Sequence, residues 1–261
     1  MKSQLWLVAL FGLRHMSGAR KLVIAALLAL LPAGLVLVVR WVGPAGAAAE
    51  ILQSGVPNLC LAVTGLLALF LGCGCMRDLL EERTLGMLLT RPISRGRLAF
   101  GLLLSAMILS CFLAAFGAAL SFAVSSVGVH ADVATPAPEA FLLVGAILLL
   151  AIVHTTLFAL IGLRFRKSTV LGVVWLFVVE AGLGSIPGPA RILSPIAMVE
   201  CILSPEFTTR ASIESADGEY AVSPVTALIV LAVMQTILLV LHQRRAARMD
   251  FLSANVSADG P

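Results

Sequence analysis

Two titratable side chains lie within long apolar runs of this 261-residue sequence, His154 beside Thr155 and Glu180 shortly before Gly182. Titratable groups inside a bilayer are costly and commonly mark a transport path or a pair. Glu180 is therefore either a carboxylate on a substrate path or a structural carboxylate that caps or pairs with the next loop, near Arg191. His154 is either a buried histidine bonded to a neighbouring helix or a group that handles protons or ligands.

Soft metal ligands cluster at Cys73, Cys75 and Met76. No matching ligand set accompanies them, and small residues also allow close helix packing, so we predict packing and no metal site. The five cysteines fit neither a disulfide framework nor a zinc spacing. A pairing of Cys60 with Cys201 stays open, because both are predicted toward the same side of the chain.

The composition is that of a membrane protein. Hydrophobic residues make up 60% of the chain and charged residues only 12%, whereas a soluble domain carries roughly 25% charged residues. The shortfall extends along the whole chain, so the sequence predicts one integral membrane domain over residues 1–261. The positive net charge does not indicate nucleic-acid binding, because the basic residues lie between the apolar runs.

A transmembrane helix needs about 20 mostly apolar residues. Six segments meet this requirement to within a few residues, and the third is longer than a span needs. They are Leu22–Val39, Leu59–Met76, Leu98–Val127, Phe141–Leu163, Thr169–Ile186 and Val225–Leu241. The predicted fold class is therefore an all-α integral membrane protein with six transmembrane helices.

The basic residues fall mainly on one side of these spans. Fifteen of the 18 Lys and Arg residues belong to the N-terminus, the loops after spans two and four, and the C-terminus, against Arg40, Arg191 and Arg210 elsewhere. Basic loops stay in the cytoplasm. We therefore expect both termini in the cytoplasm and the chain in a bacterial-type plasma (inner) membrane.

Two segments outside the spans carry helix signals. Residues 1–21 are too short to span and have no convincing cleavage site, which favours an interfacial helix anchored by Trp6 and basic residues. In the outer loop, residues 187–224, Ser194-Pro195 predicts an N-cap and first turn that open a short helix, Pro195–Leu203. That helix either closes a pathway or is part of a surface loop.

The segment Arg77–Arg97 is the most informative part of the chain. Its acidic start suits a helix that leaves the membrane, and Leu85, Leu88 and Leu89 then form an apolar stripe at helical spacing. Pro92 ends that helix. A short amphipathic helix on the cytoplasmic side suits docking into a groove of a soluble partner. An ordinary solvated hairpin is the alternative.

The order Glu-x-x-Thr-Leu-x-x-Leu-Leu-x-x-Pro-x-Ser-Arg, Glu81 to Arg95, resembles the cytoplasmic loop of type-2 ABC transporter permeases. The six-span layout, the N-terminal helix and the large outer loop resemble that family too. The resemblance implies a permease dimer, homo- or heteromeric, in which each subunit receives a separate cytoplasmic ATPase through this loop. The implied coupling residues are Glu81, Glu82, Thr84, Leu85, Leu88, Leu89, Pro92 and Arg95.

The chain has no Gly-Lys pair and therefore no phosphate-binding loop of the form G-x-x-x-x-G-K-[ST]. We expect it to be no enzyme and to hold no cofactor, with ATP and Mg²⁺ bound by the partner ATPase. The Glu81-Glu82 pair is similar to the glutamate pair of intramembrane prenyl-protein peptidases, but that motif needs an arginine four residues after the second glutamate. Position 86 is glycine, so an intramembrane peptidase is disfavoured. The expected function is an exporter permease; the alternative is a non-transporting assembly or immunity factor of permease-like architecture.

Overall fold

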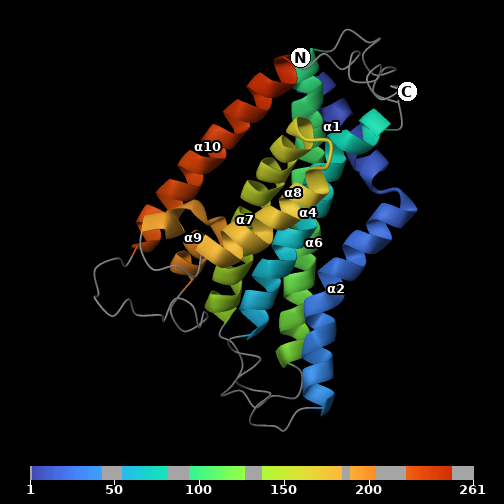
Figure 1. Ribbon diagram of the computed structural model, residues 1–261. Helices are drawn as coiled ribbons and strands as arrows, with labels where there is room; N and C mark the ends of the chain where they lie inside the picture. The colour runs from blue at the N-terminus through green and yellow to red at the C-terminus, as the bar shows by residue number, and fades with distance from the viewer. Residues whose placement is uncertain are drawn as a thin grey trace.

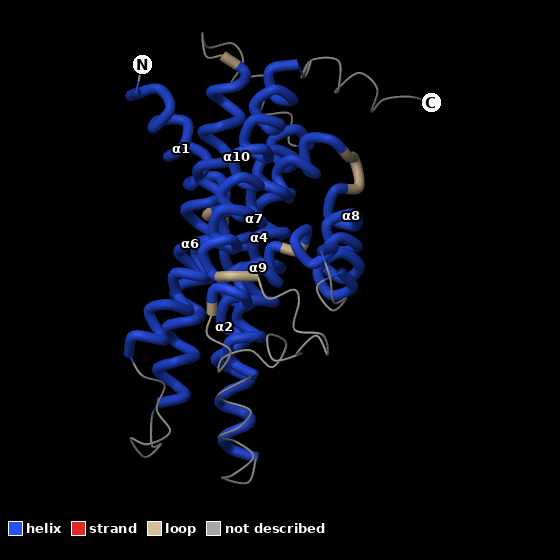
Figure 2. The backbone as a smooth tube through the Cα atoms, turned by 90° about the vertical axis from the view of Figure 1, so that its left-hand side faces the viewer, coloured by secondary structure: helices blue, strands red, loops and turns tan. Residues whose placement is uncertain are grey.

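The computed structural model describes residues 2–42, 55–81, 94–126, 137–183, 189–203 and 222–248. These residues are almost entirely helical and contain no strand (Figure 2). The helices are α1 (Lys2–Met16), α2 (Ala19–Val42), α4 (Val56–Glu81), α6 (Arg95–Ser126), α7 (Ala137–Arg164), α8 (Ser168–Val174), the π-helix η2 (Trp175–Leu183), the 3₁₀-helix η3 (Pro189–Leu193), α9 (Pro195–Ile202) and α10 (Pro224–Arg248). The all-α prediction is confirmed for this part of the chain.

Five helices are long and apolar enough to cross a membrane. Four of them contain a predicted span in full, and the third covers the predicted span from Leu98 to Ser125, while Val127 lies outside the described residues. The five helices cover Arg20–Val42, Val56–Leu79, Arg95–Ser125, Phe141–Arg164 and Pro224–Arg248. A protein with several such helices is a membrane protein. The first of them keeps Pro32 inside α2, as the sequence led us to expect.

The predicted span Thr169–Ile186 is the exception. It falls on α8 and η2, which have 7 and 9 residues. A helix of that combined length is about 24 Å long at 1.5 Å per residue, less than the roughly 30 Å of a hydrocarbon core. Among the described residues, five long spans are therefore present, and the sixth crossing would have to use this shorter, partly π-helical pair.

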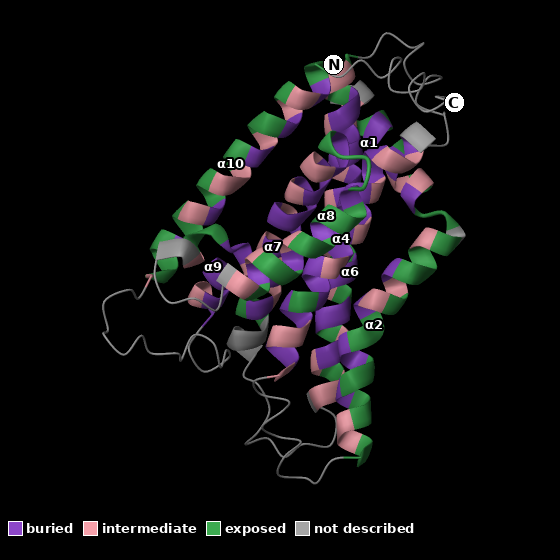
Figure 3. Ribbon diagram, in the orientation of Figure 1, coloured by how far each residue is buried: buried purple, intermediate pink, exposed green. Residues whose placement is uncertain are grey.

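The core lies between α4, α6 and α7. In the apolar windows of these three helices 72%, 61% and 56% of residues are buried, against 28% in α2 and 17% in α10. Figure 3 shows the same contrast, with buried residues gathered at the centre and exposed ones along α2 and α10. In a membrane protein those exposed apolar faces suit lipid or a second subunit.

Small residues let the central helices approach closely. A Cβ added at Gly72 of α4 would lie 2.9 Å from the Thr155 backbone oxygen, and one at Gly162 of α7 would lie 3.0 Å from the Cys73 oxygen. The first distance is shorter than real Cβ contacts, and the second is at the tight limit of them. The α4–α7 contact therefore depends on glycine on both helices, as is common in membrane interiors.

The helix ends that carry most of the basic residues lie together. In Figure 1, α4, α7 and α10 end, and α6 begins, at the upper end of the molecule, where α1 also lies. We call this the basic end. The helix α1 packs against α6, since Val8 meets Gly101 and Gly12 meets Ser105. A separate N-terminal helix is thus confirmed, and it ends at the turn Ser17-Gly18.

Candidate functional site

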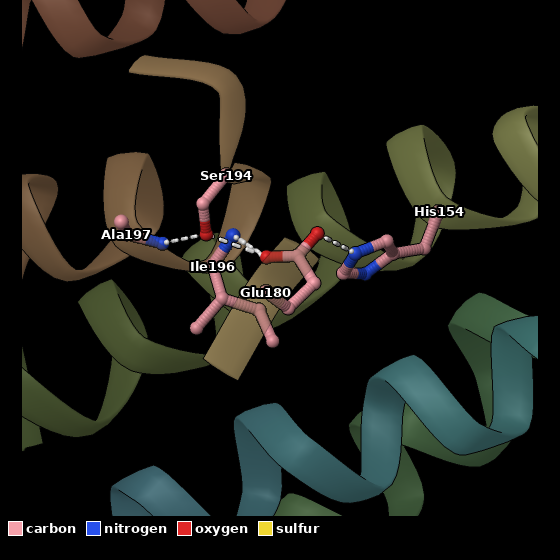
Figure 4. A network of polar contacts seen from close by, with 5 residues as sticks. All are labelled: His154, Glu180, Ser194, Ile196 and Ala197. Carbon is pink, nitrogen blue, oxygen red and sulfur yellow. Dashed lines mark hydrogen bonds and ion pairs between the residues drawn. The ribbon is translucent and has the colours of Figure 1, made fainter. Parts of the chain in front are cut away.

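A network of polar contacts lies inside the bundle, far from either end of the chain in sequence. It joins three elements, because His154 belongs to α7, Glu180 to η2, and Ser194 directly precedes α9 (Figure 4). Side-chain burial is nearly complete at all three, with 0% of His154, 3% of Glu180 and 0% of Ser194 exposed. Buried polar groups at such a site must be paired, because an unpaired one costs free energy.

Glu180 is the centre of this network and accepts three hydrogen bonds. Its Oε1 lies 2.8 Å from His154 Nε2. Its Oε2 accepts from Ser194 Oγ at 2.6 Å and from the Ile196 backbone N–H at 3.2 Å. Both carboxylate oxygens are therefore used, and Glu180 holds α7 and the start of α9 to the π-helix.

The start of α9 is capped twice. Ser194 has extended backbone angles (φ −93°, ψ 111°), and its Oγ accepts from Ala197 N at 3.2 Å while it donates to Glu180. Pro195 occupies the first turn, where a missing N–H is harmless. The negative charge of the Glu180 carboxylate at this N-terminus also interacts favourably with the positive end of the helix dipole. The predicted N-cap and short helix are thus confirmed, with α9 ending at Ile202.

The His154 ring lies close to Phe158 on its own helix and to Gly65 of α4. It stacks on Phe158 with ring centroids 5.6 Å apart, and a Cβ added at Gly65 of α4 would lie 3.9 Å from its Cε1. The hydrogen bond to Glu180 holds one proton between Nε2 and Oε1. The other nitrogen, Nδ1, is buried and has no hydrogen-bond partner among the described residues. This arrangement can lock helices together, and it can also exchange the shared proton.

The π-helix explains how Glu180 reaches these partners. A π-helix widens the backbone turn, and such turns occur often at functional sites. Here the wide turns cover Trp175–Leu183 and so include Glu180. The sequence pattern gives no sign of this change of helical period, and the His154–Glu180 pair was missed for that reason.

Arg191 has another partner than the one the sequence suggested. Its Nη2 lies 3.4 Å from Oε2 of Glu200, which is only 2% exposed. This pair ties η3 to α9. Glu200 was not singled out from the sequence, although a lone carboxylate inside the apolar run Pro195–Leu203 was the available signal.

Most of the predicted coupling residues lie outside the described residues. Glu81 is the last residue of α4 and Arg95 is the first residue of α6. The structure therefore brings the two ends of the coupling segment to the basic end. The other six predicted coupling residues, Glu82, Thr84, Leu85, Leu88, Leu89 and Pro92, lie outside the described ranges.

The cysteines serve packing in this structure. Cys75 Sγ donates to the Gly72 backbone oxygen at 3.1 Å, and no group of three or more metal-ligating side chains occurs in the part of the chain that was described. Cys60 and Cys201 are both free thiols.

Comparison with known proteins gives one family. The family described as "Protein of unknown function (DUF2705)" matches residues 40–252. The match includes the network, the segment 77–97 and four of the five long helices, and it reaches only the last three residues of α2. No curated protein matches the chain.

Proposed function

Because the chain belongs to this family, whose description names no activity, we propose a function from its own residues: it is the transmembrane permease subunit of an ATP-driven ABC exporter. A separate cytoplasmic ATPase binds ATP and Mg²⁺ and docks on the segment 77–97. A second permease subunit, identical or related, completes the pathway.

One observation carries this proposal. The order of residues from Glu81 to Arg95 resembles that of the type-2 permease coupling loop, and the helices that flank this segment, α4 and α6, both reach the basic end of the bundle. A coupling segment must lie on the side where the ATPase is. Basic residues mark that side as the cytoplasm.

The membrane topology follows from the same orientation. Five long helices cross the bilayer, and α8 with η2 makes the sixth, shorter passage before the chain turns at η3. With six passages both termini are cytoplasmic. In Figure 1, α9 lies beside the end of η2 and near the middle of the molecule's height. This position supports a short helix that dips into the membrane from the outside.

The buried network gives that short helix a role. Glu180 and His154 tie the start of α9 to η2 and α7, so α9 cannot leave without breaking buried polar contacts. We assign the network to the closed outer end of the pathway. Export then requires that ATP-driven movement at the basic end releases α9 on the outer side of the membrane.

The test is ATP hydrolysis by the complex that purifies with the full chain. The proposal predicts a co-purified ATPase whose hydrolysis is lost when Glu81→Lys and Glu82→Lys are combined, because two reversed charges remove the acidic start of the docking segment. The matched control is Glu214→Lys with Glu219→Lys, two reversals in the outer loop, which should leave association and hydrolysis unchanged. Equal hydrolysis in both double variants would contradict the coupling assignment.

A further inference from the structure

A second feature of the structure is a cavity of about 640 Å³ at the basic end. Four parts of the chain line it: the last residue of α1, the start of α2, the second half of α4, and the turn from α7 into the start of α8. Cavities of 300–1,000 Å³ are the usual size for small-ligand sites. The cavity is separate from the His154–Glu180 network, since none of the network residues lines it.

The cavity is strongly cationic. Its lining includes five basic side chains and a single carboxylate, that of Asp78; the basic residues are Arg20, Lys21, Arg77, Arg166 and Lys167. The carboxylate pairs with Lys21, whose Nζ lies 2.8 Å from Asp78 Oδ2. The lining therefore has a surplus of basic over acidic side chains, in a chain with only 12% charged residues.

The arginine and hydroxyl groups of the lining favour one class of ligand. Guanidinium groups bind phosphate oxygens through two parallel hydrogen bonds, and Arg20, Arg77 and Arg166 offer three such groups. The hydroxyls of Ser168 and Thr169 lie in the same lining and add further donors. The chemistry therefore fits a phosphate-bearing ligand.

The remaining lining is apolar and opens toward the membrane face of the bundle. Phe70 belongs to it, together with Ile24 and Val170, which are 47% and 60% exposed. Exposed leucines and valines continue from these residues along α2 and α8, at Leu27 and Val174. A soluble phosphate would leave this apolar surface uncovered, whereas acyl chains would cover it.

We propose that this cavity binds the phosphodiester headgroup of an anionic phospholipid, with the acyl chains against the exposed faces of α2 and α8. Basic pockets between transmembrane helices are known to hold such headgroups. The inference needs the chain in a membrane but not the proposed ATPase. Its failure would therefore leave the proposed function intact, and the reverse also holds.

The test is native mass spectrometry of the purified full chain in neutral detergent micelles with added phosphatidylglycerol or phosphatidylcholine. We expect retention of phosphatidylglycerol and not of phosphatidylcholine. The variant Arg166→Gln with Lys167→Gln, two exposed residues of the α7–α8 turn, should lower phosphatidylglycerol affinity about tenfold, since it removes charge-assisted hydrogen bonds.

Two controls make the result specific. Arg244→Gln with Arg248→Gln removes two exposed charges from the same end but outside the cavity, and should bind like the unchanged chain. Arg166→Lys with Lys167→Arg keeps the charge and should retain most of the affinity. Equal losses in both glutamine variants, equal binding of the two lipids, or displacement of phosphatidylglycerol by inorganic phosphate at a tenfold excess would overturn the proposal.

Discussion

Pairs of titratable side chains are buried in one region of the molecule and partly exposed in another. In the network, the side chains of His154 and Glu180 are 0% and 2% exposed and 2.8 Å apart. At the basic end, Lys21 and Asp78 are also 2.8 Å apart, but their side chains are 30% and 29% exposed. The two pairs have the same separation but different exposure to solvent. A comparison of the two pairs therefore shows how much burial, rather than contact distance, changes the contribution of a pair to stability.

The comparison teaches that equal distances do not mean equal energies. An exposed ion pair is screened by water and contributes roughly 0–1 kcal/mol. A buried pair contributes little over an apolar replacement of both partners, yet removing one partner leaves the other unpaired and costs about 3–5 kcal/mol. The network should therefore be sensitive to single substitutions, and the basic end should tolerate them.

The largest effect is expected for Glu180→Leu. Leucine fills most of the space but accepts no hydrogen bond, so His154 Nε2, Ser194 Oγ and the Ile196 N–H all lose a partner. We expect the free energy of unfolding to fall by about 3 kcal/mol. Denaturant titration of the full chain in mixed micelles, followed by tryptophan fluorescence, measures this change.

A double substitution sharpens the same prediction. When His154→Leu is added to Glu180→Leu, no unpaired imidazole remains, so the double variant should be less destabilised than the sum of the two single variants. Simple additivity would show that the 2.8 Å contact carries no coupling.

A smaller effect is expected for Ser194→Ala. The change removes the N-cap of α9 and one hydrogen bond to Glu180, while Ile196 N–H and His154 keep theirs. Loss of a serine N-cap costs about 1 kcal/mol, and the lost bond to a carboxylate brings the expected total to about 2 kcal/mol. Ser194→Thr, which keeps a hydroxyl that can accept from Ala197 N and donate to Glu180, is the control in the same titration, and an Ala variant as stable as the unchanged chain would contradict the capping role.

The smallest effect is expected at the basic end for Lys21→Ala. Because this ion pair is partly exposed, a double-mutant cycle with Asp78→Ala should give a coupling of at most about 1 kcal/mol, and added salt should reduce it. A coupling as large as that of the buried pair would mean that burial does not separate the two regions.

Sequence patterns predicted the elements of both regions better than their contacts. The Ser194-Pro195 pair was enough to predict α9, because an N-cap is a local signal of a few residues. The long spans were likewise predicted, since length and apolar composition decide them. The charge count around the spans also anticipated that the ends of α4 and α7 would lie together.

The pairing of His154 with Glu180 could not be predicted in the same way. The two residues are 26 positions apart, and the π-helix changes the face on which Glu180 lies. Neither fact follows from a 3.6-residue period. The cationic cavity was missed for a related reason, because Arg20, Arg77 and Arg166 come from three separate segments whose packing no local pattern records.

The central claim is that an ATPase docks on the segment between α4 and α6. The most direct measurement is site-specific photocrosslinking in cells, with benzoylphenylalanine placed at Leu88 in the segment or at Ile192, an exposed residue of η3. The account predicts an adduct from position 88, and not from position 192, that contains a protein labelled by a photoreactive ATP analogue. An ATP-labelled adduct absent from position 88, or equally strong from position 192, would contradict it.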